Sequence, residues 1–297
     1  MIFLFFLFSK KEKKTLSSSS SHFPLCYSKM SGCVEFLSDM ISQYPDLASS
    51  YSSMSELYVA KHWHQLTLLV YSFFKDAGNL RDGNSNFVRL YDSFVCKFDS
   101  KINQLMLSKI ACLVANSYDL NDLTSRSSLL ESLLEKRNRL GDVASLYLDM
   151  NLLQTSILRE SSVVPNESDF DPNGKALQSL KQGLKQLNNI SSKLHSQDTS
   201  CHSSYYKAAC LYYSRTKDYT NYYKSAINYL SYANLAEMPA QEKVQIARDL
   251  CDSALASEDV YNFGELLMLP VLDALKGTQE YWRVDLISAF ARGDVNG

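Results

Sequence analysis

The chain has 297 residues, of which 45% are hydrophobic and 21% are charged, and its formal net charge is −2. This size and composition allow a globular protein with a sizeable core. A pI of about 6.2 excludes the strongly basic character typical of nucleic-acid-binding domains. The sequence has only 10 glycines and 6 prolines, well below the average usage of about 12%, so it favours long helices joined by few turns.

The first 29 residues differ from the rest of the chain. The apolar run at 2–8 is followed by four lysines and then by a serine tract at 17–21. The run is too short to span a bilayer, which needs about 20 residues, and its positive charges follow it, whereas those of a secretory signal precede it. We expect residues 1–29 to be either a disordered tail or a non-native upstream extension, with Met30 as the natural start.

Apolar residues recur at helical spacing from residue 33 onward. The expected helices cover 55–75, 87–98, 102–117, 122–139, 143–158 and 175–194, with Gly141 breaking the chain between the fourth and the fifth. Such amphipathic helices cannot bury a face alone and must stack on neighbours. The predicted fold is all-α, an α-solenoid of stacked antiparallel helix hairpins like those of tetratricopeptide repeats.

The segment 161–174 is the best candidate for a boundary, because it holds two prolines, a glycine and three acidic residues. We expect an N-terminal helical-repeat lobe at 30–160, this loop at 161–174 and a C-terminal helical-repeat lobe at 175–297.

The segment 203–230 is rich in tyrosine and predicts two helices around a short turn at 216–218. Small residues opposite large rings allow two helices to approach closely. We expect one stripe on each helix to be buried; the first has Tyr206, Ala209, Cys210 and Tyr213, and the second has Tyr222, Ala226, Ile227 and Leu230.

The stretch YNFGELLMLP at 261–270 is a short, strongly apolar helix that ends at a proline. Asn262 and Glu265 have the spacing of a capping box. The four apolar residues at 266–269 cover most of a helical turn, which predicts a piece buried on all sides. Pro270 suits the first turn of a following helix.

Seven cysteines are scattered without a CxxC pair, which is typical of reduced thiols packed as small apolar residues. Cys201 and His202 lie near His195 and Asp198 in the sequence, and these are the only residues that suggest a nucleophilic site. A catalytic cysteine normally takes its histidine from a remote part of the fold.

His62 and His64 flank Trp63. Residues two apart on a helix point in different directions, so they cannot share a metal as residues four apart can. The acidic pairs Glu131 with Glu135 and Asp249 with Asp252 are expected to be solvated helix charges. We predict no catalytic, cofactor-binding or metal-binding residues, no cofactor and no small-molecule substrate.

Three stretches together resemble one family, namely ELYVAKHWHQLTLLV at 56–70, YYKSAINYL at 222–230 and VYNFGELLMLPVLDAL at 260–275. They are similar to 26S proteasome non-ATPase regulatory subunit 13, a PCI-domain subunit of the regulatory-particle lid. QEYWRVDLISAFARGDV at 279–295 fits the same pattern. The similarity extends from about residue 34 to residue 297, and Leu269 departs from it, since relatives often carry histidine there.

The resemblance implies a helical-repeat rod that leads into a PCI module, whose winged helix is expected beyond Gly297. It also implies a non-catalytic scaffold in ubiquitin-dependent degradation, in the cytoplasm and nucleus. Its partners would be other lid subunits, and no nucleic acid or membrane is expected. The alternatives are a free-standing helical-repeat binding module, or a PCI subunit of the signalosome or of a translation-initiation scaffold. An enzymatic hypothesis rests only on Cys201 and His202.

Overall fold

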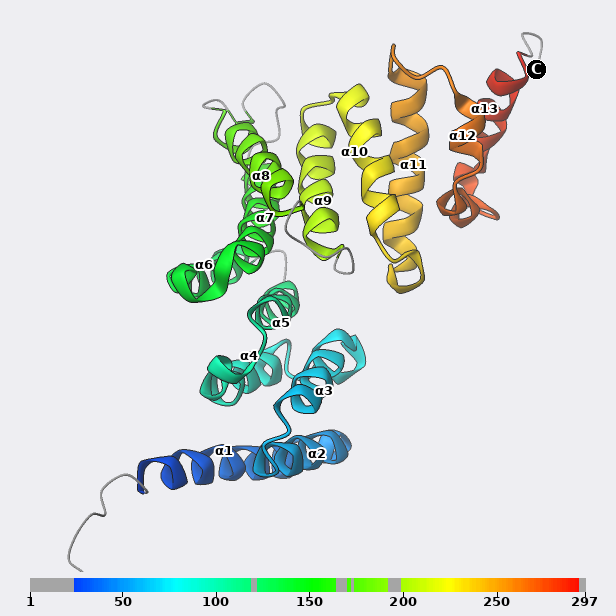
Figure 1. Cartoon of the computed structure of the whole chain (residues 1–297). Helices are drawn as coiled ribbons and strands as arrows, with labels where there is room; N and C mark the ends of the chain where they lie inside the picture. The colour runs from blue at the N-terminus through cyan, green and yellow to red at the C-terminus, as the bar shows by residue number, and fades with distance from the viewer. Residues whose placement is uncertain (1–23, 119–121, 164–169, 172–173, 192–198, 294–297) are drawn as a thin grey trace, which may run out of the picture. The chain divides into compact units, whose positions relative to one another are not determined.

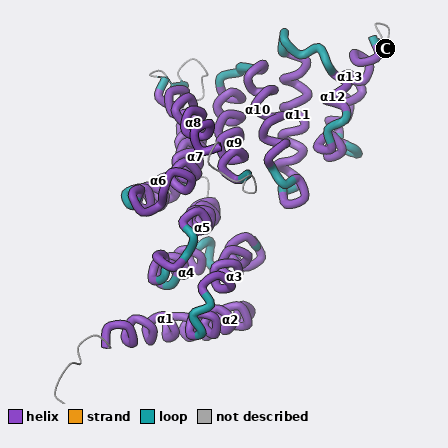
Figure 2. The backbone as a smooth tube through the Cα atoms, viewed as in Figure 1, coloured by secondary structure: helices purple, strands orange, loops and turns teal. Residues whose placement is uncertain are grey.

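The computed structural model describes residues 24–118, 122–163, 170–171, 174–191 and 199–293. Its described residues form helices and turns, with no strand among them (Figure 2). The chain divides into two compact units, Met1–Lys61 and His62–Gly297. Most of the segment 161–174 lies outside the described residues, so its role as a boundary between two lobes stays a prediction.

The helices are labelled in Figure 1. Their bounds are α1 Pro24–Gln43, α2 Ala48–Val59, α3 Trp63–Lys75, α4 Ser85–Ser93, α5 Gln104–Asn116, α6 Leu123–Leu134, α7 Arg137–Val163, α8 Lys175–Ser191, α9 Ser200–Arg215, α10 Tyr219–Tyr232, α11 Ala240–Ala256, α12 Phe263–Leu267 and α13 Trp282–Arg292. Short 3-10 helices join several of them, at Pro45–Leu47, Ala77–Asn79, Val95–Lys97, Asp99–Lys101, Leu235–Glu237, Pro270–Leu275 and Gln279–Tyr281.

The predicted helix at 55–75 is wrong in one respect, because it is two helices. Helix α2 ends at Val59 and α3 begins at Trp63, and Lys61 between them has a φ of 58°. A residue in this left-handed conformation cannot continue a right-handed helix. The apolar spacing stays helical on both sides of the break, which is why periodicity alone did not reveal it.

The first unit is a pair of packed helices. Helix α1 contacts α2, and the core between them contains Leu37, Met40, Tyr51 and Met54, all fully buried.

The second unit is a succession of packed helices, in which α3 and α4 both contact α5 and α5 contacts α6. Helix α7 contacts α5, α6, α8 and α9, and α10 contacts both α9 and α11. Only three residues separate α9 from α10, so the chain reverses direction there (Figure 1). These are the stacked helix hairpins of an α-solenoid, and the predicted all-α fold is confirmed.

The tyrosine-rich helix α9 has two packing faces, not the single stripe expected. Tyr205, Ala208, Ala209 and Tyr212 are buried in the core shared with α7 and α8. Cys210, predicted in the same stripe as Ala209, is half-buried against the core of α10 and α11. A helix inside a solenoid has neighbours on two sides, and therefore the expected set mixed residues from both faces.

The stretch 261–270 also differs from its prediction. Asn262 is the residue before α12, but its side chain makes no capping hydrogen bond. Leu266 is fully buried, whereas Met268 is 83% exposed, so the piece is not enclosed on all sides. The expectation for Pro270 is confirmed, because it occupies the first turn of the 3-10 helix Pro270–Leu275.

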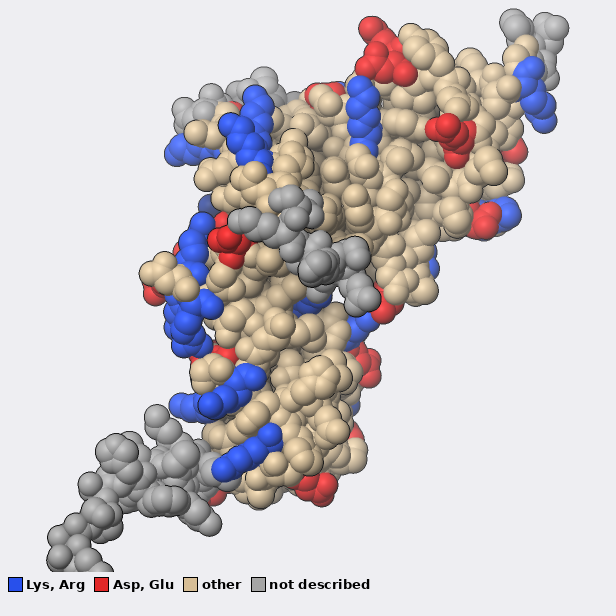
Figure 3. All heavy atoms as spheres, in the orientation of Figure 1, with Lys and Arg blue, Asp and Glu red and all other residues tan. Residues whose placement is uncertain are grey.

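Within the described residues, no helix is both long enough and apolar enough to cross a membrane. The face drawn in Figure 3 shows Lys and Arg interspersed with Asp and Glu, with uncharged surface between them. This mixture agrees with the small net charge of the sequence.

Candidate functional site

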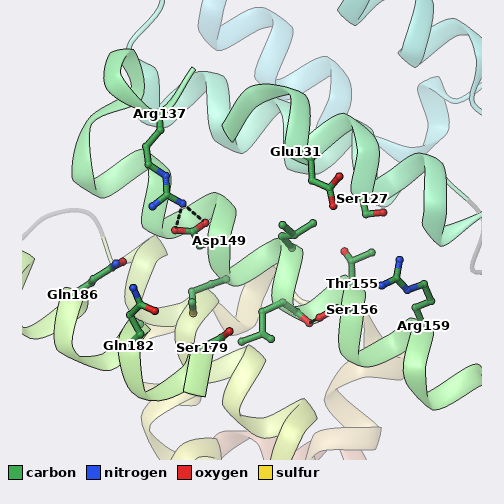
Figure 4. Close-up of a pocket in the computed structure, with 14 residues that line it drawn as sticks. Ser127, Glu131, Arg137, Asp149, Thr155, Ser156, Arg159, Ser179, Gln182 and Gln186 are labelled. Carbon is green, nitrogen blue, oxygen red and sulfur yellow. Dashed lines mark hydrogen bonds and ion pairs between the residues drawn. The ribbon is translucent and has the colours of Figure 1, made fainter. Parts of the chain in front are cut away.

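A polar groove of about 360 Å³ lies between α6, α7 and α8 in the second unit (Figure 4). Helix α6 supplies one wall, α8 supplies the other, and the long helix α7 runs between them. The lining residues are Ser127, Glu131, Arg137, Asp149, Met150, Leu152, Leu153, Thr155, Ser156, Arg159, Ser179, Gln182, Gly183 and Gln186.

The α8 wall is a row of polar side chains. Figure 4 shows Gln186, Gln182 and Ser179 one after another along α8, opposite Glu131 and Ser127 of α6. The sequence creates this row because the apolar residues of α8 point the other way. Their buried members, Ala176, Leu180, Leu187 and Ile190, belong to the core shared with α7 and α9.

The floor of the groove is apolar and tightly packed. Met150 and Leu153 of α7 are buried beneath the polar walls. Gly183 allows α8 to approach this floor, because a Cβ atom there would lie 2.8 Å from Met150 Cε and 3.0 Å from its Sδ. A side chain at 183 would therefore have to displace the tip of Met150.

One end of the groove is marked by an ion pair. Arg137 Nη2 donates to both carboxylate oxygens of Asp149, at 2.6 and 2.8 Å. Twelve residues of straight helix would separate the two by about 18 Å. The non-helical backbone of Gly141, with φ 76° and ψ 172°, kinks α7 between them and lets Arg137 turn back. The predicted break at Gly141 is thus confirmed, because the two helical parts of α7 meet at a non-helical residue.

Burial and charge act on Asp149 in opposite directions. Partial burial raises the pKa of its carboxyl group, and the neighbouring Arg137 guanidinium lowers it, with burial the larger effect. Asp149 and Arg137 therefore form their ion pair at a position that is partly shielded from water.

A second hollow of about 580 Å³ continues from this end and shares Arg137 and Gln186 with the first. Its other lining residues are Asn138, Gly141, Asp142, Ser145, Asn189 and Ile190. The two hollows together follow α8 from Ser179 to Asn189, a length of about 15 Å at the helical rise.

The chemistry available along this groove is hydrogen bonding. Several hydroxyls already donate to their own helix, as Thr155 does to the Asn151 carbonyl at 3.0 Å and Ser156 to the Leu153 carbonyl at 2.8 Å. No hydrogen bond of the Gln182 or Gln186 carboxamide is found within the described part of the chain. These two side chains can each offer a donor and an acceptor to a ligand.

Of the residues that suggested a nucleophile, the structure describes Cys201 and His202. Cys201 is 1% exposed, and its thiol lies 3.5 Å from the Val143 carbonyl. The His202 ring stacks on Tyr232 with centroids 4.7 Å apart, and burial lowers its pKa. His195 and Asp198 lie outside the described residues, so the prediction that the chain has no catalytic residues stays a prediction.

His62 and His64 are both exposed, at the start of α3. Among the residues that the structure describes, no three His, Cys, Asp or Glu side chains gather closely enough to hold a metal ion.

The acidic pairs are not all solvated as expected. Asp252 of α11 accepts a hydrogen bond from Arg283 Nε of α13 at 2.6 Å. Asp249 accepts from the Gln245 carboxamide at 2.8 Å, and burial raises its pKa. Glu131 is exposed but lines the groove, which the sequence interpretation missed. The sequence does contain one sign of the groove, because Gln182, Gln186 and Asn189 are spaced so that they share one face of a helix.

The family model described as PSD13 N-terminal repeats matches residues 50–287. The chain belongs to this family.

Curated relatives agree with this assignment. The chain is 30% identical over 262 residues to the 26S proteasome non-ATPase regulatory subunit 13 homolog A of Arabidopsis thaliana, which covers 88% of this chain and 64% of the relative. It is 29% identical over 262 residues to the 26S proteasome non-ATPase regulatory subunit 13 of Dictyostelium discoideum, covering 88% and 63%. It is 31% identical over 264 residues to the probable 26S proteasome regulatory subunit rpn9 of Schizosaccharomyces pombe, covering 88% and 63%. The chain thus spans a little under two thirds of the length of these relatives.

Proposed function

We propose that the chain is a non-catalytic scaffold subunit of the regulatory-particle lid of the 26S proteasome, acting in ubiquitin-dependent protein degradation. The observation that carries the proposal is the match of 50–287 to the PSD13 N-terminal repeats, together with relatives that are named proteasome regulatory subunits. In this proposal the partners are other lid subunits, and the protein acts in the cytoplasm and nucleus.

The surface of the last helices supports a role in assembly. On α13, Trp282, Leu286 and Phe290 recur every fourth residue, and they are 53%, 38% and 56% exposed. Exposed apolar rows of this kind are typical of surfaces that another protein covers. Beside this row, α13 is anchored by Ile287, which is fully buried, and by the Arg283–Asp252 ion pair.

The test is affinity purification of the tagged chain from cells that contain proteasomes, with the longer relative purified in parallel. The proposal expects lid subunits to be recovered in stoichiometric amounts. A Leu286→Asp, Phe290→Asp variant should lose them, whereas Leu184→Asp, at a leucine of α8 that is also 38% exposed, should keep them. Recovery of lid subunits by the relative but not by this chain would overturn the proposal.

A free-standing helical-repeat binding module is the second candidate function, and the polar groove between α6 and α8 favours it. Under that function the tagged chain would sediment alone and recover no lid subunits, while still binding a ligand through the groove.

A further inference from the structure

A small apolar pocket of about 150 Å³ lies between α9, α10 and α11, which follow one another in the solenoid (Figure 1). Helices α9 and α11 each contribute four lining residues, and α10 contributes Tyr222 and Tyr229. The fully buried Ala226, which belongs to the core between these helices, does not line the pocket. Ser214 and Gln245 of the lining are exposed, so the pocket opens at the surface.

The lining of the pocket is mostly apolar and can be reached by a ligand. Cys210, Leu211 and Ile246 are half-buried, so each keeps some accessible surface. Burial raises the pKa of the Cys210 thiol to about 12, so this side chain is uncharged at neutral pH and acts as a small apolar group. A cavity of about 150 Å³ that was engineered into another protein binds benzene. The pocket therefore has the size of a single six-membered ring.

The three charged residues of the lining already have partners. Lys207 Nζ donates to Glu242 Oε1 at 2.6 Å. Asp249 accepts a hydrogen bond from Gln245 Nε2 at 2.8 Å, and Arg248 Nε lies 3.4 Å from its other carboxylate oxygen. A charged ligand would enter an apolar space in which its possible countercharges are already engaged, and burying an unpaired charge is costly. The pocket therefore favours a neutral ligand.

One polar group of the lining lacks a partner. Tyr222 is only 6% exposed, and no hydrogen bond of its hydroxyl is found within the part of the chain that the structure describes. Its oxygen is not fully enclosed, and the lining residues Cys210 and Asp249 both act on its pKa, so the hydroxyl lies among the groups around the pocket. The Tyr229 hydroxyl, by contrast, donates to Glu242 Oε1 at 3.3 Å. A ligand that bonds to the Tyr222 hydroxyl would satisfy a polar group that is costly to bury alone.

We propose that this pocket receives the phenol ring of a tyrosine side chain from a partner protein, with the ring packed against Leu211 and Ile246 and its hydroxyl hydrogen-bonded to that of Tyr222. Two phenols can form this bond because each is both a donor and an acceptor. The rings of Tyr222 and Tyr229 favour an aromatic occupant over an aliphatic one. A pocket that opens at the surface and holds one ring suits a side chain whose backbone stays outside, and tyrosine is a frequent anchor in such pockets. The proposal stands without the role in the proteasome lid, because it concerns a pocket of the isolated chain.

The first experiment titrates the purified full chain with p-cresol, which is the tyrosine side chain as a free molecule, and with toluene, which lacks the hydroxyl. NMR of isotope-labelled methyl groups follows Leu211 and Ile246 and gives each Kd. Tyr222→Phe should weaken the binding of p-cresol about fivefold, because one hydrogen bond is lost, and should leave the binding of toluene unchanged. Tyr223→Phe is the matched control, since this neighbouring half-buried tyrosine does not line the pocket, and it should change neither Kd.

Two further measurements test the location of the site and the source of the ring. Cys210→Leu places a larger side chain in the pocket and should weaken both ligands about tenfold or more. N-acetyltyrosinamide, which carries backbone on both sides of the ring, should bind within about threefold of p-cresol. Circular dichroism should show that every variant keeps its helix content.

Three outcomes would overturn the proposal. The first is the absence of any p-cresol-dependent shift at the methyl groups of Leu211 and Ile246. The second is equal affinity of Tyr222→Phe and Tyr223→Phe for p-cresol. The third is binding of N-acetyltyrosinamide about tenfold or more weakly than p-cresol, which would assign the pocket to a free phenol and not to a partner's side chain.

Discussion

The layers of α9, α10 and α11 and the groove flanked by α6 and α8 are built from the same kind of amphipathic helix, but they fill the space between helices differently. In the layers, alanines close the gap. Ala226 of α10 and Ala247 of α11 are fully buried beside Tyr222 and Leu250. In the groove, polar side chains line an open space above a narrow apolar floor. The same helical repeat can therefore form either a sealed joint or an open groove.

Helix α7 belongs to both regions and explains how they are joined. On one side, its Asn151 Nδ2 and Gln154 Nε2 donate to the Oγ and carbonyl of Ser204 in α9, at 3.0 and 2.9 Å. On the other side, its Met150 and Leu153 reach the floor of the groove. The polar ties to α9 fix the register of α7, so the floor of the groove has a defined position.

The largest expected difference between the two regions is the loss of stability when a leucine is replaced by alanine. Leu250→Ala, in the closed layers, should lower the free energy of unfolding by about 2–5 kcal/mol, because a fully buried side chain leaves a cavity that its neighbours cannot fill. Leu184→Ala, on the 38% exposed face of α8, should change it by less than about 0.5 kcal/mol. Urea denaturation followed by circular dichroism measures both. Equal losses would mean that the layers are not sealed as described.

The next largest expected effect is a loss of stability at high pH. Burial, with the nearby Tyr213 and Tyr206, raises the pKa of Tyr205 from 10.0 to about 12. Burial likewise raises the pKa of Tyr222 and Tyr229. In each case the folded state holds its proton at a pH where the unfolded chain releases it. Stability is thus fully present below pH 10 and is lost as the pH rises through the folded-state values.

Phenolate absorbance during an alkaline titration checks this expectation. The folded protein should show a group of tyrosines that ionise later than those of the same chain in urea. Tyr205→Phe should remove part of the late absorbance change and part of the loss of stability above pH 10. A folded-state titration that superimposes on the unfolded one would contradict the burial of these rings.

A smaller effect is expected for the polar ties between α7 and α9. Ser204→Ala removes the hydroxyl that accepts from Asn151, while Asn151 keeps its bond to the Tyr147 carbonyl at 2.7 Å. The free energy of unfolding should fall by about 1 kcal/mol, the net value of one buried hydrogen bond. Ser203→Ala, at the neighbouring half-buried position, should be nearly neutral. If both serines behave alike, the bond does not hold α7 in register.

The sequence predicts a region well when the residues that form it lie close together along the chain, and poorly when they come from different helices. The helices and most of their buried residues, such as Leu180 and Leu187 of α8, follow from spacing along a single helix. Leu184 has the same spacing but is exposed, because the neighbouring helices do not cover that part of α8. The groove requires α6 and α8 to flank one side of α7, and local spacing does not contain that information.

The smallest expected effect tests the floor of the groove. Gly183→Ala gains the helix propensity of alanine, worth about 1 kcal/mol, but its Cβ would lie 2.8 Å from Met150 Cε. Since a methionine side chain can change its rotamer, much of the gain should be offset, and stability should change by less than about 0.5 kcal/mol. Gly32→Ala in α1 is the control, because its Cβ would have no atom within 4 Å and the full gain should appear. Equal stabilisation by both substitutions, measured by thermal unfolding, would show that Met150 does not press against α8, and the floor of the groove would then be looser than its packing indicates.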